Sequence, residues 1–297
     1  MKKFIKYFLF IQSLSLLGQD YDFHTFGKEE GISQTYIYDL VQSSKGFLYA
    51  ATGDGLSVFD GFGFQVFRTE DGLAENFCTT IFIDSRQRKW IGHLEGGITL
   101  IDSSGIKKIT GKEESASKIV SFSEDEHGVV YCASADGWIY CFKGRTKAKV
   151  NMFRFTTINK MSIKGNLMFI ASTQGLLSFN IYPVFSLRQT FGDSKDENIT
   201  ALAIDENSEI LAGVDGKGLF EYEATNNYYF LKRKYSNELK SKYLGIKDIC
   251  LGPNKEVFLS LNGEGIRQYS RKNDTVSIDM NVIDGSNGLR SLYISRI

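Results

Sequence analysis

Short runs in which apolar and polar residues alternate cover most of the chain, and glycine, asparagine or aspartate separates one run from the next. Because successive side chains of a strand point to opposite faces of a sheet, this pattern predicts short β-strands joined by tight turns. The clearest stretch predicts four successive strands, at residues 36–41, 47–52, 56–59 and 64–67. Apolar positions at helical spacing form no stretch of useful length, so the sequence predicts an all-β protein.

This four-strand unit repeats along the chain. The large apolar residue of its second strand recurs at intervals of 41, 41, 38, 42 and 47 residues, at Tyr49, Trp90, Tyr131, Phe169, Leu211 and Phe258. The glycine of the following turn recurs as Gly55, Gly97, Gly137, Gly175, Gly218 and Gly265. A period of about 40 residues that contains four strands is typical of a β-propeller blade. We therefore expect a β-propeller with six complete four-stranded blades, in which Trp90 and Trp138 pack within the blades.

Both ends of the array carry parts of a further unit. Residues 23–26 match the fourth strand of a unit, and residues 291–297 match a first strand. These matches predict an incomplete seventh blade where the ring closes, and a chain that is a fragment truncated at its C-terminus. The exposed strand edges of a half-blade would favour aggregation or a partner.

A targeting segment precedes the array. Residues 1–18 begin with lysines, continue with the apolar run 7–17 and end at the small residue Gly18, which is the pattern of a secretory signal peptide. We predict cleavage after Gly18, so that residues 19–297 form a propeller domain exported to the periplasm. An uncleaved N-terminal anchor is the alternative. No later apolar run is long enough to cross a bilayer.

Charge and motif content exclude several classes of function. The chain has 35 Lys and Arg residues against 35 Asp and Glu residues, which argues against broad binding to nucleic acid or acidic membranes. The basic, tyrosine-rich stretch from Lys232 to Lys242 is therefore predicted to be an outer strand and its connection. The histidines His24, His93 and His127 are scattered, and the sequence holds no catalytic motif, phosphate loop or metal-binding pattern. We expect no catalysis in this chain, no metal and no cofactor.

Two of the four cysteines, Cys132 and Cys141, flank a predicted turn almost symmetrically. Export would permit a disulfide across that hairpin. Two small buried strand residues are the simpler interpretation, and the one that we favour.

One unit carries a family resemblance. Residues 46–60 read G-F-L-Y-A-A-T-G-D-G-L-S-V-F-D, which resembles the repeat of the two-component regulator propeller family, G-x-L-W-I-G-T-x-x-G-L-x-x-Y/F-D. The second unit keeps the core Trp90-Ile91-Gly92 but has His93 where that pattern has threonine. The fourth to sixth units diverge further.

The resemblance implies a role in signalling. It implies a periplasmic sensor with one or two propellers, followed by a small β-sandwich domain, a membrane helix and a cytoplasmic output that is commonly a histidine kinase. It also implies a small-molecule ligand, in many members an oligosaccharide from polysaccharide breakdown. The sandwich, membrane and kinase regions are not in this chain, and the sequence leaves a homodimer open.

The candidate ligand-binding residues lie at one predicted end of the ring, where the turns between second and third strands meet the connections between blades. They are Thr52, Asp54, His93, Glu95, Asp136, Gln174, Asp215, Lys217 and Glu264. Carboxylate and amide groups of this kind accept hydrogen bonds from sugar hydroxyls. Asp54, Asp136 and Asp215 also have a structural explanation, because Asp-Gly is a common tight-turn sequence.

Three functional hypotheses follow from the sequence. The first is a periplasmic ligand-binding sensor propeller of a two-component regulator. The alternative from another class is an exported scaffold propeller that binds a protein partner. The third, a propeller lyase or hydrolase, would use His93 in catalysis.

Overall fold

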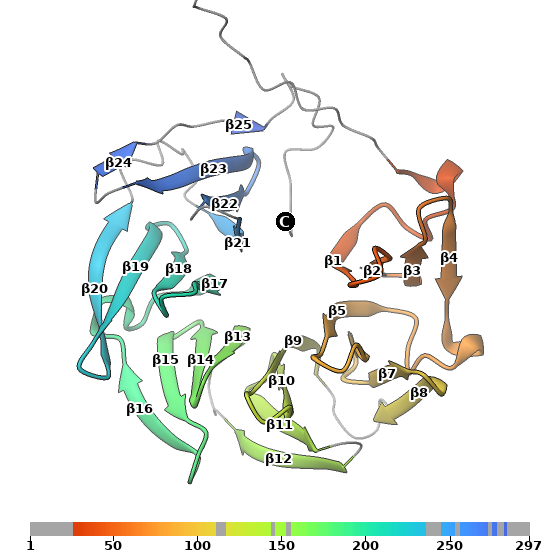
Figure 1. Ribbon diagram of the computed structural model, residues 1–297, viewed down its shortest axis with the longest axis horizontal. Helices are drawn as coiled ribbons and strands as arrows, with labels where there is room; N and C mark the ends of the chain where they lie inside the picture. Colours follow the sequence, from red (N-terminus) through yellow and green to blue (C-terminus); the bar gives the residue numbers. More distant parts are fainter. Residues whose placement is uncertain are drawn as a thin grey trace, which may run out of the picture.

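Six antiparallel sheets stand around a common centre in the computed structural model (Figure 1). The structure describes residues 26–110, 117–143, 146–152, 156–235, 245–252, 256–272, 275–277 and 282–283. Within these residues the regular structure is strand, apart from three short 3-10 helices. The prediction of an all-β propeller with six blades is therefore confirmed.

The first three sheets, blades 1 to 3, each contain four strands paired in chain order. Their strands are β1 (Ile37–Gln42), β2 (Leu48–Thr52), β3 (Gly55–Phe59), β4 (Phe64–Phe67), β5 (Cys78–Ile83), β6 (Lys89–His93), β7 (Ile98–Asp102), β8 (Gly105–Thr110), β9 (Ile119–Glu124), β10 (Val130–Ser134), β11 (Trp138–Lys143) and β12 (Thr146–Met152). The bounds of β1 to β4 agree within one residue with the four strands predicted for the first unit.

Blades 4 to 6 repeat this order. Their strands are β13 (Ile158–Lys164), β14 (Leu167–Ser172), β15 (Gly175–Asn180), β16 (Ser186–Thr190), β17 (Ile199–Ile204), β18 (Ile210–Val214), β19 (Gly218–Thr225), β20 (Tyr228–Tyr235), β21 (Ile246–Leu251), β22 (Glu256–Leu261), β23 (Gly265–Lys272), β24 (Thr275–Ser277) and β25 (Val282–Ile283). In blade 6 both β24 and β25 pair with β23. The first strand of each blade lies nearest the centre of the ring, and we call it the inner strand (Figure 1).

A β-bulge lies at the second residue of every inner strand. Pairing with the neighbouring strand skips one residue there, at Tyr38, Thr79, Val120, Asn159, Thr200 and Lys247. A bulge re-aims the side chain of the extra residue. In three blades that side chain donates a hydrogen bond to a carbonyl of the next inner strand, from Thr79 to Ile119 (2.7 Å), from Asn159 to Ile199 (2.8 Å) and from Thr200 to Ile246 (2.6 Å). The bulges therefore tie neighbouring blades together near the centre.

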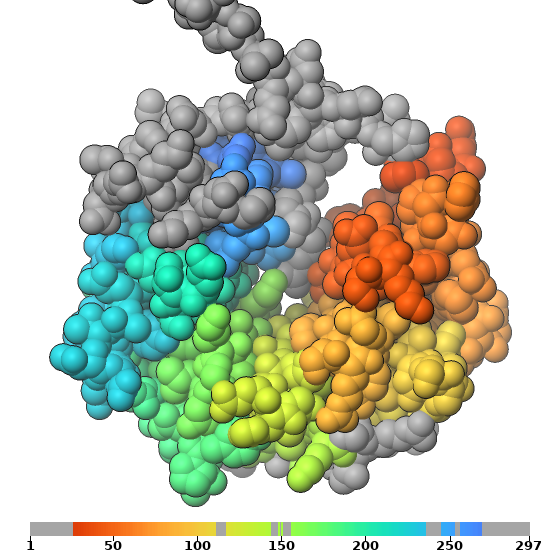
Figure 2. Space-filling view, in the orientation of Figure 1, coloured from red at the N-terminus to blue at the C-terminus, as the bar shows by residue number. Residues whose placement is uncertain are grey.

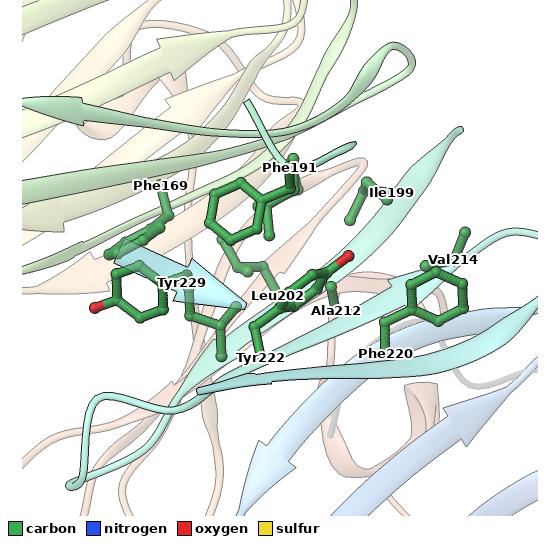
Figure 3. Close-up of a cluster of buried hydrophobic side chains, with 12 residues drawn as sticks. Phe169, Phe191, Ile199, Leu202, Ala212, Val214, Phe220, Tyr222 and Tyr229 are labelled. Carbon is green, nitrogen blue, oxygen red and sulfur yellow. The ribbon is translucent and has the colours of Figure 1, made fainter. Parts of the chain in front are cut away.

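The hydrophobic core is divided into clusters that lie between neighbouring blades. Figure 3 shows the cluster between blades 4 and 5, where the rings of Phe191 and Tyr222 meet edge to face with centroids 5.0 Å apart. Phe169 and Tyr229 pack beside them, with centroids 5.2 Å apart. Side chains fill the space between successive described blades in Figure 2. From blade 1 to blade 6, consecutive sheets thus bury apolar side chains against each other.

The connections into blades 1 and 2 have the same local structure. Each contains a 3-10 helix, η1 (Lys28–Glu30) or η2 (Thr69–Asp71), and each helix ends at a glycine with positive φ. These angles are 94° at Gly31 and 110° at Gly72, a conformation that other residues adopt only with strain. The repeat therefore includes the connections as well as the strands.

The two tryptophans take part in the packing of the blades, as predicted. Trp90 is buried and Trp138 is partly buried against the cluster between blades 2 and 3. The turn of blade 2 differs from the prediction by one residue: Gly96, and not Gly97, has the positive φ, 89°. The reason is that this turn is one residue longer than the turn of blade 1.

Cys132 and Cys141 are both free thiols. Strand pairing places Cys132 opposite Tyr140 and Tyr131 opposite Cys141, so the two cysteines point to opposite faces of blade 3. The disulfide alternative is therefore wrong. The predicted symmetry of the hairpin is off by one residue, so that Cys132 and Cys141 are not paired across it. Cys132 is buried, and Cys141 is partly buried.

Several sequence predictions lie outside the described residues. These are the signal peptide over 1–18, residues 23–25 of the first extra strand, the extra strand at 291–297 and, with it, the incomplete seventh blade. The basic stretch is described only as far as Tyr235, and there it forms the outer strand β20 as predicted.

Candidate functional site

The turns between second and third strands lie at the same end of the ring as the segments that enter the inner strands. In blades 2 to 6 the first residue of this turn donates its backbone N–H to the carbonyl of the residue just before the inner strand of the same blade. The pairs are Leu94 and Phe77 (3.2 Å), Ala135 and Lys118 (2.8 Å), Thr173 and Thr157 (3.0 Å), Asp215 and Asn198 (2.9 Å), and Asn262 and Gly245 (2.9 Å). We call this end of the ring the turn face. All nine predicted ligand-binding residues lie in these turns or at the strand ends beside them.

His93, which ends β6, is fully buried. Its Nδ1 lies 3.2 Å from the carbonyl oxygen of Phe77, and its Nε2 lies 2.8 Å from Oγ1 of Thr99. The Thr99 hydroxyl also accepts the backbone N–H of Ala74 at 2.9 Å, which leaves its own hydrogen for Nε2. Both ring nitrogens are satisfied when the imidazole is neutral, and burial lowers the pKa of His93 to about 4. His93 therefore joins the connection to blade 2 and does not reach the surface.

Thr52 occupies the same place at the end of β2 and is also fully buried. Its hydroxyl donates to the carbonyl of Gly55 at 2.8 Å and accepts the backbone N–H of Asp54 at 3.1 Å. The hydroxyl of Ser33 lies 2.8 Å away and bonds in turn to Ser57 at 2.8 Å. Thr52 thus holds the turn and the incoming connection in place.

Asp54 forms a two-point ion pair at the turn face. Nε and Nη2 of Arg68 lie 3.2 Å and 3.0 Å from its two carboxylate oxygens. These hydrogen bonds lower the pKa of Asp54, while its limited burial opposes the shift. The carboxylate is ionised and its charge is balanced by an arginine from the segment that follows β4.

The other predicted residues are spread over blades 2 to 6. Glu95, Asp136, Gln174, Asp215 and Lys217 are exposed, and Glu264 is partly buried. Several have a protein partner: Ser134 with Asp136 (2.5 Å), Glu197 with Lys217, and Arg267 with Glu264 (2.9 Å). They form a polar rim around the turn face, in which neighbouring blades supply one or two residues each.

Sequence reasoning missed a group of aromatic side chains on the same face. Tyr36 lies just before β1, and its ring centroid is 4.6 Å from that of Tyr38. The Tyr38 ring is in turn 4.8 Å from Phe77 of the next connection. Tyr36 is 55% exposed, whereas Tyr38 and Phe77 are partly buried. We call these three residues the aromatic ledge.

A sequence signal for the ledge exists at the bulge position of the repeat. Blade 1 has Tyr38 there, whereas the other five blades have Thr79, Val120, Asn159, Thr200 and Lys247. Among the six blades, only blade 1 has an aromatic residue at this position. The contact of the Tyr38 ring with both Tyr36 and Phe77 depends on the bulge, which the sequence does not show.

Gln34 lies beside the ledge. Its side chain accepts the backbone hydrogen bond that, in blades 2 to 6, goes to the carbonyl of the residue before the inner strand. In blade 1 the N–H of Gly53, the first turn residue, donates to Oε1 of Gln34 at 2.9 Å. A Cβ atom added to Gly53 would lie 2.5 Å from that oxygen and 3.4 Å from Cε2 of Phe77. Because Gly53 has no side chain, the Gln34 amide and the Phe77 ring can both lie close to its backbone.

Two kinds of feature are missing from the part of the chain that the structure describes. No group of three or more His, Cys, Asp or Glu side chains is arranged to hold a metal ion. The described residues also contain no helix with the length and apolar character needed to span a membrane.

Comparison with known proteins finds the same fold in propellers of several kinds. No family model and no curated protein matches the sequence. The extracellular domain of a hybrid two-component system from B. thetaiotaomicron superposes with a TM-score of 0.69 at 16% identity, over 94% of this chain and 37% of that one. A second extracellular domain of this kind, from the same organism, gives 0.53 at 18% identity over 86% and 41%. Selenomethionine-substituted virginiamycin B lyase from Staphylococcus aureus gives 0.65 at 11% identity over 84% of each chain.

These likenesses establish the fold alone. The chain spans about two fifths of the two sensor-system chains, 37% and 41% of their lengths. Domains of sensor systems, lyases and a WD40 domain all share the propeller with this chain, so its function has to be argued from its own residues.

Proposed function

We propose that this chain is the ligand-binding sensor propeller of a two-component signalling protein, exported to the periplasm, and that a small ligand such as an oligosaccharide binds at its turn face. The observation that carries the proposal is the propeller shared with an extracellular domain of a hybrid two-component system over 94% of the chain. The repeat over residues 46–60 supports it, because it resembles the two-component regulator propeller repeat. Sandwich, membrane and kinase regions elsewhere in the full protein would transmit the binding event.

The chemistry of the turn face supports binding of a polar, uncharged molecule. Exposed carboxylates and amides such as Glu95, Asp136 and Gln174 line its rim, and the aromatic ledge adds apolar surface. Ligand sites combine apolar or aromatic walls with a few polar groups that fix orientation.

The described histidines favour binding over catalysis. A general base must come within hydrogen-bond reach of the proton that it removes. His93 is buried with both ring nitrogens bonded, and His127 lies in the turn between β9 and β10, at the end of the ring opposite the turn face. Neither histidine is placed to act on a ligand at the turn face, which argues against the lyase hypothesis.

The test is ligand binding by the full chain. A library that contains neutral oligosaccharides, acidic oligosaccharides and other small metabolites is screened by thermal shift, and hits are measured by calorimetry. A ligand at about 100 times its Kd stabilises the folded state by about 2.7 kcal/mol, so hits are expected to raise Tm by several degrees. If no compound of any class binds, while a protein partner is recovered from envelope extract, the scaffold alternative replaces the sensor proposal.

A further inference from the structure

We infer that the aromatic ledge of Tyr36, Tyr38 and Phe77, together with Gln34, is the place on the turn face where a neutral saccharide ring of the ligand stacks. The inference rests on the proposed function, because it gives that sensor's ligand a chemistry and a position.

The ledge offers an apolar surface of the right kind. Tyr36 and Tyr38 lie two positions apart along one extended segment, and their rings and that of Phe77 follow one another at 4.6 Å and 4.8 Å. The outermost ring, Tyr36, is 55% exposed. The rings are inclined to one another, by 55° between Tyr36 and Tyr38 and by 51° between Tyr38 and Phe77. A pyranose ring presents C–H groups on its faces and hydroxyls around its edge, so one of its faces can stack on the exposed Tyr36 ring while the inclined rings border it. Tyrosine suits both the faces and the edge of the sugar, since its ring is apolar and its hydroxyl forms hydrogen bonds.

Gln34 supplies oriented hydrogen-bond donors next to these rings. Its Oε1 is occupied by the N–H of Gly53 at 2.9 Å, which fixes the carboxamide at the edge of the ledge. The amide nitrogen of the same group carries two N–H donors, for which no described residue provides an acceptor. Hydroxyls of a sugar ring that is stacked on the ledge can accept these hydrogen bonds.

The surrounding charges favour a neutral ligand. Asp54, which follows Gly53, is balanced by the two-point contact with Arg68, and the buried His93 imidazole is neutral at physiological pH. Glu75 of the adjacent connection uses its carboxylate oxygens to accept the N–H groups of Glu95 and Gly97, both at 2.8 Å. The ionised side chains that flank the ledge thus have protein partners of their own.

Calorimetry with a panel of neutral and acidic oligosaccharides tests the ledge in the full chain. The variants are Tyr36→Ala, Tyr38→Ala and Gln34→Leu, with Tyr36→Phe as the conservative change that keeps the ring. Tyr228→Ala is the matched control, because Tyr228 is 52% exposed on the outer strand β20, away from the inner strands. Circular dichroism and Tm confirm that each variant is folded.

We expect a neutral oligosaccharide to bind, and Tyr36→Ala and Tyr38→Ala to weaken its binding by about tenfold or more, which corresponds to about 1.4 kcal/mol. Gln34→Leu should weaken binding severalfold, whereas Tyr36→Phe and Tyr228→Ala should stay within about twofold of wild type.

The outcomes separate this inference from the sensor proposal. Saccharide binding that survives both alanine variants overturns the ledge and leaves the sensor proposal intact. If a library compound that is not a saccharide binds and no saccharide does, the ledge inference is likewise overturned and the sensor proposal stands. The absence of any small ligand overturns both.

Discussion

At the scale of single residues, the place of His93 in the repeat shows how one substitution is compensated by its neighbours. In blade 1 the hydroxyls of Thr52 and Ser33 together link the turn to Ser57. In blade 2 the imidazole of His93 reaches Thr99 directly, and the residue that corresponds to Ser33 is Ala74, which has no hydroxyl. One larger side chain thus replaces two small ones, and the buried hydrogen bonds are preserved.

We predict that His93 makes the fold sensitive to acid. Burial lowers its pKa from about 6.5 in the unfolded chain to about 4 in the folded chain, so between these values the unfolded state binds more protons. The stability from His93 is complete above about pH 6.5 and is lost as pH falls towards about 4. A shift of this size corresponds to roughly 3 kcal/mol.

The measurement is urea unfolding from pH 7.5 to pH 4 for wild type and His93→Gln, with His127→Gln as the control. His127→Gln makes the same substitution at a histidine whose side chain is 60% exposed, so it controls for the exchange itself. His93→Gln should be less stable at pH 7.5 and should lose less stability on acidification. Equal slopes for wild type and His93→Gln would contradict the prediction.

Sequence reasoning selected His93 correctly as an unusual residue but interpreted it as a ligand-binding group. Its position at the turn face follows from the repeat, whereas its burial depends on Thr99 and Phe77, which belong to other segments of the chain. Tyr36 is predicted only as the first residue of a strand, and the fold leaves its side chain 55% exposed. Exposure is a property of the assembled ring, and a single sequence does not contain it.

At the scale of elements, small residues in the second strands set how closely the blades approach. A Cβ atom at Gly92 in β6 would lie 2.6 Å from Cγ2 of Ile119 in the next inner strand and 2.8 Å from Cγ2 of Thr80. The equivalent residue in blade 5, Gly213, would bring its Cβ within 3.0 Å of Ile246. The sequence repeat predicts where these strands occur. It does not predict how closely the blades approach each other, which contacts such as these determine.

We predict that Gly92→Ala destabilises the fold by about 1–3 kcal/mol, because the added methyl group overpacks the space between blades 2 and 3. Gly63→Ala is the control, since its Cβ would meet nothing within 4 Å. Urea unfolding of both variants measures the difference. A cost for Gly92→Ala no larger than for Gly63→Ala would show that blade 3 can shift without penalty.

At the scale of the whole molecule, one ion pair connects two blades that are not neighbours. Lys160 is the third residue of the inner strand β13 in blade 4, and Asp248 is the third residue of β21 in blade 6. Nζ of Lys160 lies 3.2 Å from Oδ1 of Asp248. The strand between them, β17, has the short side chain of Ala201 at this position, and Figure 1 shows β17 between β13 and β21. The pair therefore spans part of the centre of the ring.

The period of the repeat predicted the blades and their order, because each blade is built from local strand pairing. A contact between third residues of β13 and β21 depends instead on the curvature of the ring, which the bulges and the packing between blades determine. The alternating pattern places Lys160 and Asp248 on inner strands, but nothing in the sequence relates residues 88 positions apart.

We predict that this ion pair couples blades 4 and 6 energetically. The Asp248 side chain is 6% exposed and that of Lys160 is 25% exposed, so solvent screens the attraction between the two charges only weakly. A double-mutant cycle with Lys160→Met and Asp248→Asn, measured by urea unfolding, should give a coupling energy of about 1–3 kcal/mol. The same cycle on Lys217 and Glu197, whose side chains are 53% and 24% exposed, should give less than about 1 kcal/mol. Equal coupling in the two cycles would contradict the prediction, because it would mean that solvent screens the central pair as strongly as the exposed one.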